Sequence, residues 1–194
     1  MSAALAPGTD AAICNRAIPR TVQDWIDQLP AENLPAGRVV LTPSKVSDCI
    51  ADLFAAQGIL SSPPVSWIQA DAEQMAYAVA DLVGTGLVRL RLEPVFDDAC
   101  SKLHIDNVVA RLICTYRGPG TVLGLDSGHE AALQTVPTGL PVLLKGKQWP
   151  GAQMPELRHR SPAILGSGQS RLMLVLEGCT EKDIFPAYDE IYQS

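Results

Sequence analysis

The second half of this chain consists of short apolar runs separated by proline and glycine, and this rhythm limits its fold more than any other feature. It begins after Gly86, where Leu87–Leu92 alternates apolar and basic residues with the period of two of a half-buried strand. Strands at such short intervals favour an antiparallel sandwich or barrel, because parallel strands need long crossover connections. Further runs of this kind lie at 108–116, 121–125, 141–145, 157–164 and 171–177.

The first half of the chain favours helices instead. Apolar residues recur at helical spacing over 21–29, 44–57 and 66–83, and each stretch is followed by a proline or a glycine. A brief strand is expected at 39–41. Residues 1–20 are rich in alanine, proline and glycine, bury little, and are expected to remain mobile.

These patterns together predict an α+β fold. At 194 residues the chain has the length of one domain with a full-sized core. We expect a flexible N-terminal segment over 1–20 and a single domain over 21–194. In this domain the N-terminal helices, over 21–84, pack on a C-terminal antiparallel double-stranded β-helix, a cupin-like jelly roll, over 85–194.

The charge and the cysteines limit the partners and the compartment. The net charge of −6 and the pI near 5.0 argue against nucleic acid as a partner, because such binding depends on clustered Lys and Arg. The five cysteines are odd in number, widely spread and without a CxxC motif, which indicates free thiols in a reducing compartment. The chain does not open on a basic head and an apolar run, and no stretch reaches the roughly eighteen apolar residues of a membrane span. We therefore expect no signal peptide, no membrane partner and a cytoplasmic location.

Two of the three histidines are candidates for a metal site. His104 precedes Asp106 by two residues, so on a strand both side chains point to one face of the sheet. His159 comes from a later predicted strand and can meet them there, whereas His129 lies in a polar loop and is expected to be solvated. Two imidazoles and one carboxylate form the ligand set of a facial metal triad, with open positions for substrate and dioxygen on iron or for water on zinc. A histidine bonded only to its neighbour is the competing interpretation of the His-x-Asp pair.

Arg171 is the candidate anchor for an anionic cosubstrate. It opens the predicted strand 171–176. If this strand forms a hairpin with 157–164 and Arg171 lies opposite Ala163, the arginine shares the face of His159, roughly 13 Å along the sheet. A small diacid that chelates the metal at one end could then reach the guanidinium fork with its other carboxylate. Other registers would turn Arg171 outward.

Three residues of the next strand are further candidates. Tyr116 and Arg117 enter a Pro-Gly turn from a strand that begins just after the His-x-Asp pair. We consider them as contacts for an anionic substrate, with an exposed pair as the alternative. Cys114 lies an even number of residues after His104 and Asp106, so on a continuous strand it would point to the same face. It is therefore considered as an extra metal ligand, with a buried thiol as the alternative.

The chain resembles a bacterial family known only as a domain of unknown function. Members of that family are often encoded near zinc-uptake and zinc-regulator genes, which implies a link to metal homeostasis. The resemblance covers most of residues 85–177. It rests on HxD at 104–106, RLxCTYRGPGT at 111–121, HRSP at 159–162 and RLxLVL at 171–176.

The order of these motifs is also similar to that of the 2-oxoglutarate and iron(II) dependent dioxygenases. Their jelly roll holds an HxD…H triad and a later basic residue for the cosubstrate. This similarity implies that iron(II) is bound by His104, Asp106 and His159. It also implies that Arg171 binds the distal carboxylate of 2-oxoglutarate.

Three hypotheses follow. The first is an iron(II) and 2-oxoglutarate dependent dioxygenase that acts on a small-molecule or protein substrate. The second is a non-catalytic zinc-binding protein linked to metal homeostasis, in which Cys114 could complete the ligand set. The third is a jelly roll whose site is degenerate and which only binds a partner. The sequence leaves open the substrate, the choice between iron and zinc, and the oligomeric state.

Overall fold

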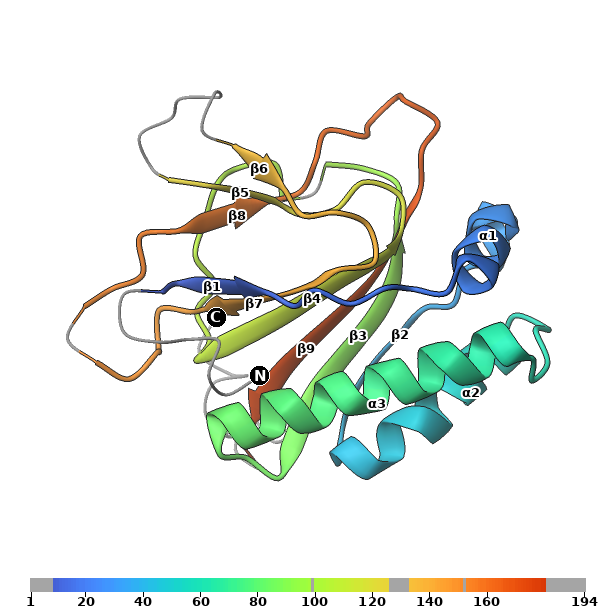
Figure 1. The fold of residues 1–194 in the computed structure, drawn as a ribbon, viewed down its shortest axis with the longest axis horizontal. Helices are drawn as coiled ribbons and strands as arrows, with labels where there is room; N and C mark the ends of the chain where they lie inside the picture. Colours follow the sequence, from blue (N-terminus) through green and yellow to red (C-terminus); the bar gives the residue numbers. More distant parts are fainter. Residues whose placement is uncertain (1–8, 99, 126–132, 152, 181–194) are drawn as a thin grey trace, which may run out of the picture.

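Antiparallel pairing organises the strands into two sheets (Figure 1). The computed structural model describes residues 9–98, 100–125, 133–151 and 153–180. The larger sheet has six strands in the order β1 (Ala11–Ile13), β7 (Pro141–Lys145), β4 (Ala110–Arg117), β9 (Arg171–Cys179), β3 (Leu87–Val95) and β2 (Gly37–Leu41). The smaller sheet has three strands in the order β6 (Gln134–Thr135), β5 (Val122–Gly124) and β8 (Arg158–Arg160).

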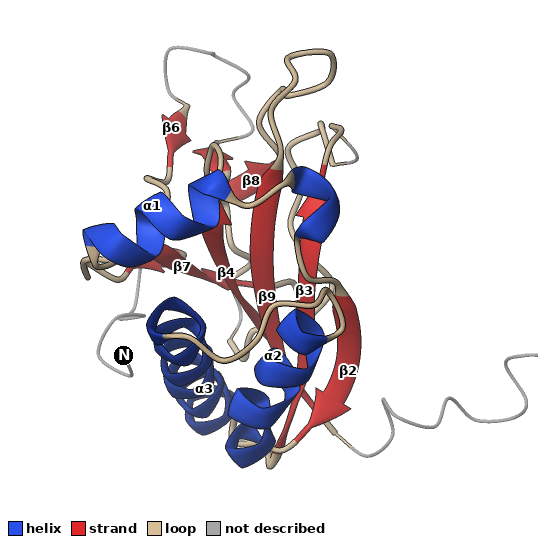
Figure 2. Cartoon of the chain, turned by 90° about the vertical axis from the view of Figure 1, so that its right-hand side faces the viewer, coloured by secondary structure: helices blue, strands red, loops and turns tan. Residues whose placement is uncertain are grey.

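Helices cover one face of the larger sheet, and the smaller sheet lies against the other (Figures 1 and 2). The predicted combination of N-terminal helices and antiparallel sheet is therefore confirmed. None of the helices in the described part of the chain is long and apolar enough to cross a membrane. The helices are α1 (Arg20–Gln28), α2 (Val46–Ala55) and α3 (Pro63–Val83), with 3-10 turns η2 (Ala31–Asn33) and η3 (Pro43–Lys45) between them.

Side chains of the larger sheet alternate between two cores. Leu90, Leu112 and Leu174 are buried against the helices. Ile113 and Val175 face the smaller sheet instead. The period of two along each strand dictates this alternation, and it explains why β4 and β9 are apolar on both faces. The candidate site lies on the face toward the smaller sheet.

Helix α3 begins three residues before its predicted start and ends where predicted. Ser62 caps its N-terminus by accepting a hydrogen bond from the Val65 amide, and two prolines follow the cap in the first turn. Proline is favoured there because its missing N–H would have no partner inside the helix. The Ser-Pro-Pro sequence is thus a start signal that apolar spacing alone does not show. Gly84 ends the helix with a positive φ of 73°.

Part of the N-terminal segment that was expected to be flexible packs on the rest of the fold, within residues 9–20. Strand β1 pairs with β7 at the edge of the larger sheet. Arg16 then forms an ion pair with Asp71 of α3 at 2.7 Å. The segment is held by main-chain hydrogen bonds and a long-range ion pair, neither of which is visible in its composition.

Candidate metal centre

A reciprocal pair of backbone hydrogen bonds brings the two candidate histidines together. His104 and His159 form an antiparallel bridge in which each amide donates to the other's carbonyl at 3.0 Å. Residues paired in this way point to the same face, and the two imidazole centroids lie 4.4 Å apart. Asp106 follows two residues after His104. One donor atom from each of the three residues lies within 4.8 Å of the other two.

The donor atoms of this cluster are oriented for a cation. Nδ1 of His104 lies 2.8 Å from the carbonyl oxygen of Lys102, which can only accept, so Nδ1 carries the proton and the Nε2 lone pair is free. Nε2 of His159 lies 3.1 Å from Oδ2 of Asp106. Within the described residues, however, no donor is aligned with this buried oxygen. Two imidazole nitrogens and a carboxylate oxygen without a donor fit a divalent metal ion with open coordination positions.

Arg111 holds the other oxygen of Asp106. Its guanidinium forms one ion pair with Oδ1 of Asp106 and another with Glu177. Glu177 lies directly opposite Arg111 on β9 and also accepts from Arg89 at 3.3 Å. The guanidinium therefore occupies Oδ1 of Asp106, which lies 3.5 Å from Nε2 of His104, and leaves Oδ2 beside the His159 imidazole.

The Asp106 carboxyl is held in its ionised form. Burial raises its pKa, but the nearby His159 imidazole and the Arg111 guanidinium lower it by more, so that the pKa lies below the ordinary 3.8. Metal ligands of this type must be deprotonated. Asp106 meets this requirement at neutral pH.

Arg171 lines the same cavity as the two histidines. It is only 1% exposed, and it donates from Nε to the Pro119 carbonyl at 2.7 Å and from Nη2 to the Thr115 hydroxyl at 3.2 Å. Nη1 is buried without a hydrogen-bond partner in the described part of the chain. Burial lowers the pKa of Arg171 to about 10, so the side chain remains a cation at neutral pH. A buried cation with an unused donor is costly, and an anionic ligand would remove that cost.

The register that brings Arg171 to this cavity differs from the predicted one. The expected hairpin of 171–176 with 157–164 does not form, because β9 pairs with β3 and β4 while β8 pairs with β5. Arg171 lies opposite Val95 of β3. The cavity is instead lined by Arg171 from the larger sheet and by His159 from the smaller one. The two residues meet because the sheets face each other.

The cavity is small as it stands. Its volume is about 50 Å³, whereas sites for small ligands commonly measure about 300–1,000 Å³. Long side chains such as Arg91 and Met173 form part of its wall, and the exposed Cys100 lies at its edge. A small diacid can therefore enter only if such side chains move.

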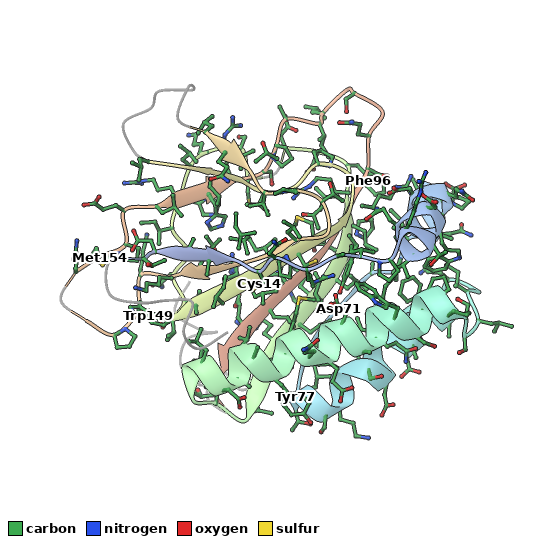
Figure 3. The ribbon with its side chains drawn as sticks, viewed as in Figure 1. Cys14, Asp71, Tyr77, Phe96, Trp149 and Met154 are labelled. Carbon is green, nitrogen blue, oxygen red and sulfur yellow. The ribbon has the colours of Figure 1, made fainter. Side chains whose placement is uncertain are left out.

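Tyr116 and Arg117 lie on the helical side of the larger sheet and not at the cavity. The Tyr116 hydroxyl donates to Asp71 at 2.6 Å, and Asp71 lies between α3 and the sheet (Figure 3). Arg117 donates to the Leu29 carbonyl, just after α1, at 2.5 Å. A β-bulge between Thr115 and Arg117 shifts the alternation of β4, so that neighbouring side chains both turn to the helices. The geometry gives no support to the predicted substrate contacts.

Cys114 also points toward the helices, so the structure does not bring it to the other candidate ligands. Its sulfur accepts a hydrogen bond from Arg16 at 3.3 Å. Burial raises the pKa of this thiol to about 12, so it is not the thiolate that zinc binds. Cys114 does not share the face of His104 and Asp106 because residues 107–109, between Asp106 and β4, do not belong to a strand.

Arg111 and Glu177 are site residues to which the sequence analysis assigned no role. Each is a charged residue within an apolar strand, and such a residue is rarely buried unless it is paired. This signal could have marked both of them. Their mutual pairing depends on the register of β4 and β9, which no local pattern shows. His129 lies outside the described residues.

Comparison with solved structures finds distant likenesses in fold, one of them to a protein solved with 2OG and Fe. JOX2, solved in complex with 2OG, Fe and JA, is 13% identical and matches with a TM-score of 0.51 over 95% of this chain and 72% of its own. A prolyl-4-hydroxylase from Pseudomonas putida is 14% identical, with a TM-score of 0.47 over 91% of this chain and 95% of its own. AtDAO1 from Arabidopsis thaliana, a dioxygenase for auxin oxidation solved with 2-oxoglutarate, is 12% identical, with a TM-score of 0.44 over 93% of this chain and 73% of its own. The likeness to JOX2 is one of fold.

The chain belongs to the DUF1826 family of proteins of unknown function, whose family model matches residues 1–177. The match includes every residue of the candidate metal centre. It confirms the resemblance to a family of unknown function that the motifs indicated. No match was found among curated proteins.

Proposed function

We propose that the protein is an oxidoreductase of the iron(II) and 2-oxoglutarate dependent dioxygenase type, with His104, Asp106 and His159 as its metal ligands. The observation that carries this proposal is the convergence of three donor atoms within 4.8 Å of one another. The two facing antiparallel sheets would then be the walls of a double-stranded β-helix, or jelly roll. The likeness in fold to JOX2, solved with 2OG and Fe, supports this reading of the sheets.

The side chains around the metal position have separate tasks in this proposal. His104 presents Nε2 because its Nδ1 proton is directed to the Lys102 carbonyl. Asp106 supplies the negative charge, and Arg111 limits it to one free oxygen. Bound iron(II), with 2-oxoglutarate and dioxygen in its open positions, would supply the oxidising chemistry. Arg171 would bind the distal carboxylate of 2-oxoglutarate through its unused Nη1 donor.

Iron binding and 2-oxoglutarate turnover test the proposal together. Wild-type protein with iron(II), ascorbate and 2-oxoglutarate is expected to release succinate slowly in the absence of substrate. His104→Ala and Asp106→Ala are expected to lose both iron binding and succinate release. Asp48→Ala, which removes an exposed carboxylate on α2, is the matched control and should behave as wild type. Iron-loaded wild type that neither binds 2-oxoglutarate nor releases succinate would contradict the proposal.

Arg171 can be tested apart from the metal. Arg171→Gln should leave iron affinity unchanged and weaken 2-oxoglutarate binding by about tenfold to a hundredfold, because a hydrogen bond to a charged group is worth about 1.5–3 kcal/mol. Thr115→Val is the control, since it removes one hydrogen bond from Arg171 but leaves the cation in place. Equal 2-oxoglutarate affinity in wild type and Arg171→Gln would remove Arg171 from its proposed role.

A non-catalytic zinc site is the second candidate function, and the small volume of the cavity favours it. Two imidazoles, one carboxylate and a water molecule would complete a tetrahedral zinc site without any cosubstrate. Metal analysis of protein purified without added metal separates the two functions. Near-stoichiometric zinc, together with no 2-oxoglutarate binding to the zinc or the iron form, would favour the zinc-binding protein.

A further inference from the structure

The cavity at the metal centre is lined by an excess of arginine. No aspartate or glutamate is among its lining residues in the described part of the chain. The whole protein has the opposite balance, with 21 acidic and 15 basic residues. The cations are thus concentrated at the site. The lining arginines are Arg91, Arg111, Arg160 and Arg171.

Arg91 has no task in the metal centre or in the proposed binding of 2-oxoglutarate. Arg111 is engaged by its two carboxylates, and Arg171 is assigned to the cosubstrate. Arg91 lies one strand further toward the edge of the sheet, on β3, with its Nε 3.2 Å from Glu93. Its side chain is 27% exposed, so it borders both the cavity and the solvent.

Arg38 adds a second cation beside Arg91. The two residues are directly opposite each other on β2 and β3, so their side chains share one face and lie close together. Like charges in this arrangement repel. No ion pair to Arg38 is formed by the carboxylates of the described residues. The neighbouring Gly37 faces Leu53 of α2, which confirms that Arg38 faces away from the helices.

The corner that holds these two arginines is less covered than the rest of the sheet. Apolar contacts with the smaller sheet come mainly from β4, β7 and β9, through residues such as Ile113, Val142 and Met173. Strands β2 and β3 present Arg38 and Arg91 on the same side. The site therefore combines an apolar wall with a cationic, accessible rim.

We propose that the substrate of this site is a small molecule with an anionic group, a carboxylate or a phosphate, that is bound by Arg91 and Arg38. This inference rests on the proposed function, because it assigns Arg171 and the metal to 2-oxoglutarate. Two adjacent guanidinium groups suit such an anion, which would also remove their mutual repulsion. A divalent metal ion and the dianion of 2-oxoglutarate cancel in charge. Glu93 balances only one of the two guanidinium groups, so one positive charge at this corner is left for an anionic substrate. The apolar wall would take the carbon part of the substrate.

The test measures anion binding when the metal and cosubstrate positions are already filled. Full-length protein is loaded with zinc, saturated with 2-oxoglutarate, and titrated by calorimetry with phenylacetate, phenyl phosphate and the neutral phenylacetamide. At least one anion is expected to bind about tenfold more tightly than the amide. The tighter of the two anions identifies carboxylate or phosphate as the preferred group. Failure of both anions to bind, or equal binding of anions and amide, would overturn the inference.

Variants then assign the preference to the two arginines. Arg91→Gln and Arg38→Gln should each weaken the anion by about tenfold. Arg38 does not line the cavity, so Arg38→Gln should also leave 2-oxoglutarate affinity unchanged. Arg20→Gln removes the same charge from the exposed surface of α1 and should have no effect. If Arg91→Gln bound the anion as tightly as wild type, this inference would be overturned while the proposed function would stand. Absence of 2-oxoglutarate binding in wild type would overturn the proposed function and this inference with it.

Discussion

Arg111 and Glu177 lie directly opposite each other on β4 and β9 and form an ion pair behind the candidate metal centre. The same guanidinium holds one oxygen of Asp106. The orientation of the carboxylate proposed to bind the metal is thus set by a charge on the larger sheet. This arrangement makes Glu177 a positioning residue, although it does not belong to the three candidate ligands.

Glu177→Gln should therefore weaken iron(II) binding. Loss of its charge loosens Arg111 and with it Asp106, and partners of this kind typically change metal affinity by about 10–100-fold. Competition with a chelating dye measures the affinity. Glu93→Gln, a neutralised carboxylate on the same face of the sheet, is the control and should leave iron affinity intact. Equal iron affinity in Glu177→Gln and wild type would show that Arg111 holds Asp106 unaided.

Tyr116→Phe should lower stability without affecting the metal. It removes the buried hydrogen bond to Asp71, on the helical side of the sheet, and should lower the free energy of unfolding by about 1–3 kcal/mol. Urea denaturation measures this change, and Tyr77→Phe, at an exposed position of α3, is the control. If Tyr116→Phe lost succinate release but kept its stability, Tyr116 would instead have a role at the candidate site.

Cys114→Ala should leave zinc affinity unchanged. The thiol lies on the far side of the sheet among the helices, and burial keeps it protonated by raising its pKa to about 12. Competition with a zinc-binding dye compares the variant with wild type at neutral pH. A clear loss of zinc affinity would mean that Cys114 is a ligand after all.

Asp71 should make the stability of the protein depend on pH. Burial raises its pKa above the ordinary 3.8, and the Tyr116 hydroxyl and Arg16 offset only part of that effect. Between 3.8 and the raised value, the folded chain holds more protons at this carboxyl than the unfolded chain does. The contribution of Asp71 to the free energy of unfolding therefore falls as pH rises through this window.

The variant Asp71→Asn isolates this titration because its amide binds no proton. Relative to wild type, its free energy of unfolding should increase as pH rises from below 3.8 through the window, because only the wild type loses stability there. Urea denaturation of both proteins over a pH series measures the difference. A difference that stays constant with pH would contradict the raised pKa of Asp71.

Local patterns predicted the parts of the fold that depend on local rules. The alternation of 87–92 gave β3 and the apolar spacing of 66–83 gave most of α3, because periods of two and 3.6 are properties of single elements. Strand β1 was missed, since Ala11–Ile13 is ordered by main-chain pairing with β7 and not by its own side chains.

The candidate site shows the same division between local and distant information. His104 and Asp106 are two residues apart, so their common direction could be expected from the sequence. The predicted approach of Arg171 to His159 relied on a hairpin that does not form, although both line one cavity. Cys114 was considered as a metal ligand because it lies an even number of residues after His104 and Asp106. Residues 107–109 are not in a strand, so they break the alternation on which that prediction relied. Strand registers depend on tertiary packing, which a single sequence does not show.

The binding of iron(II) and 2-oxoglutarate at His104, Asp106 and His159 can be measured by an anaerobic titration followed by visible absorption. Chelation of protein-bound iron(II) by 2-oxoglutarate produces a charge-transfer band that neither component gives alone. We expect wild type to show this band with near-stoichiometric iron, Asp106→Ala to lack it, and Asp48→Ala to retain it. Absence of the band in wild type at saturating iron(II) and 2-oxoglutarate would contradict the assignment of this site.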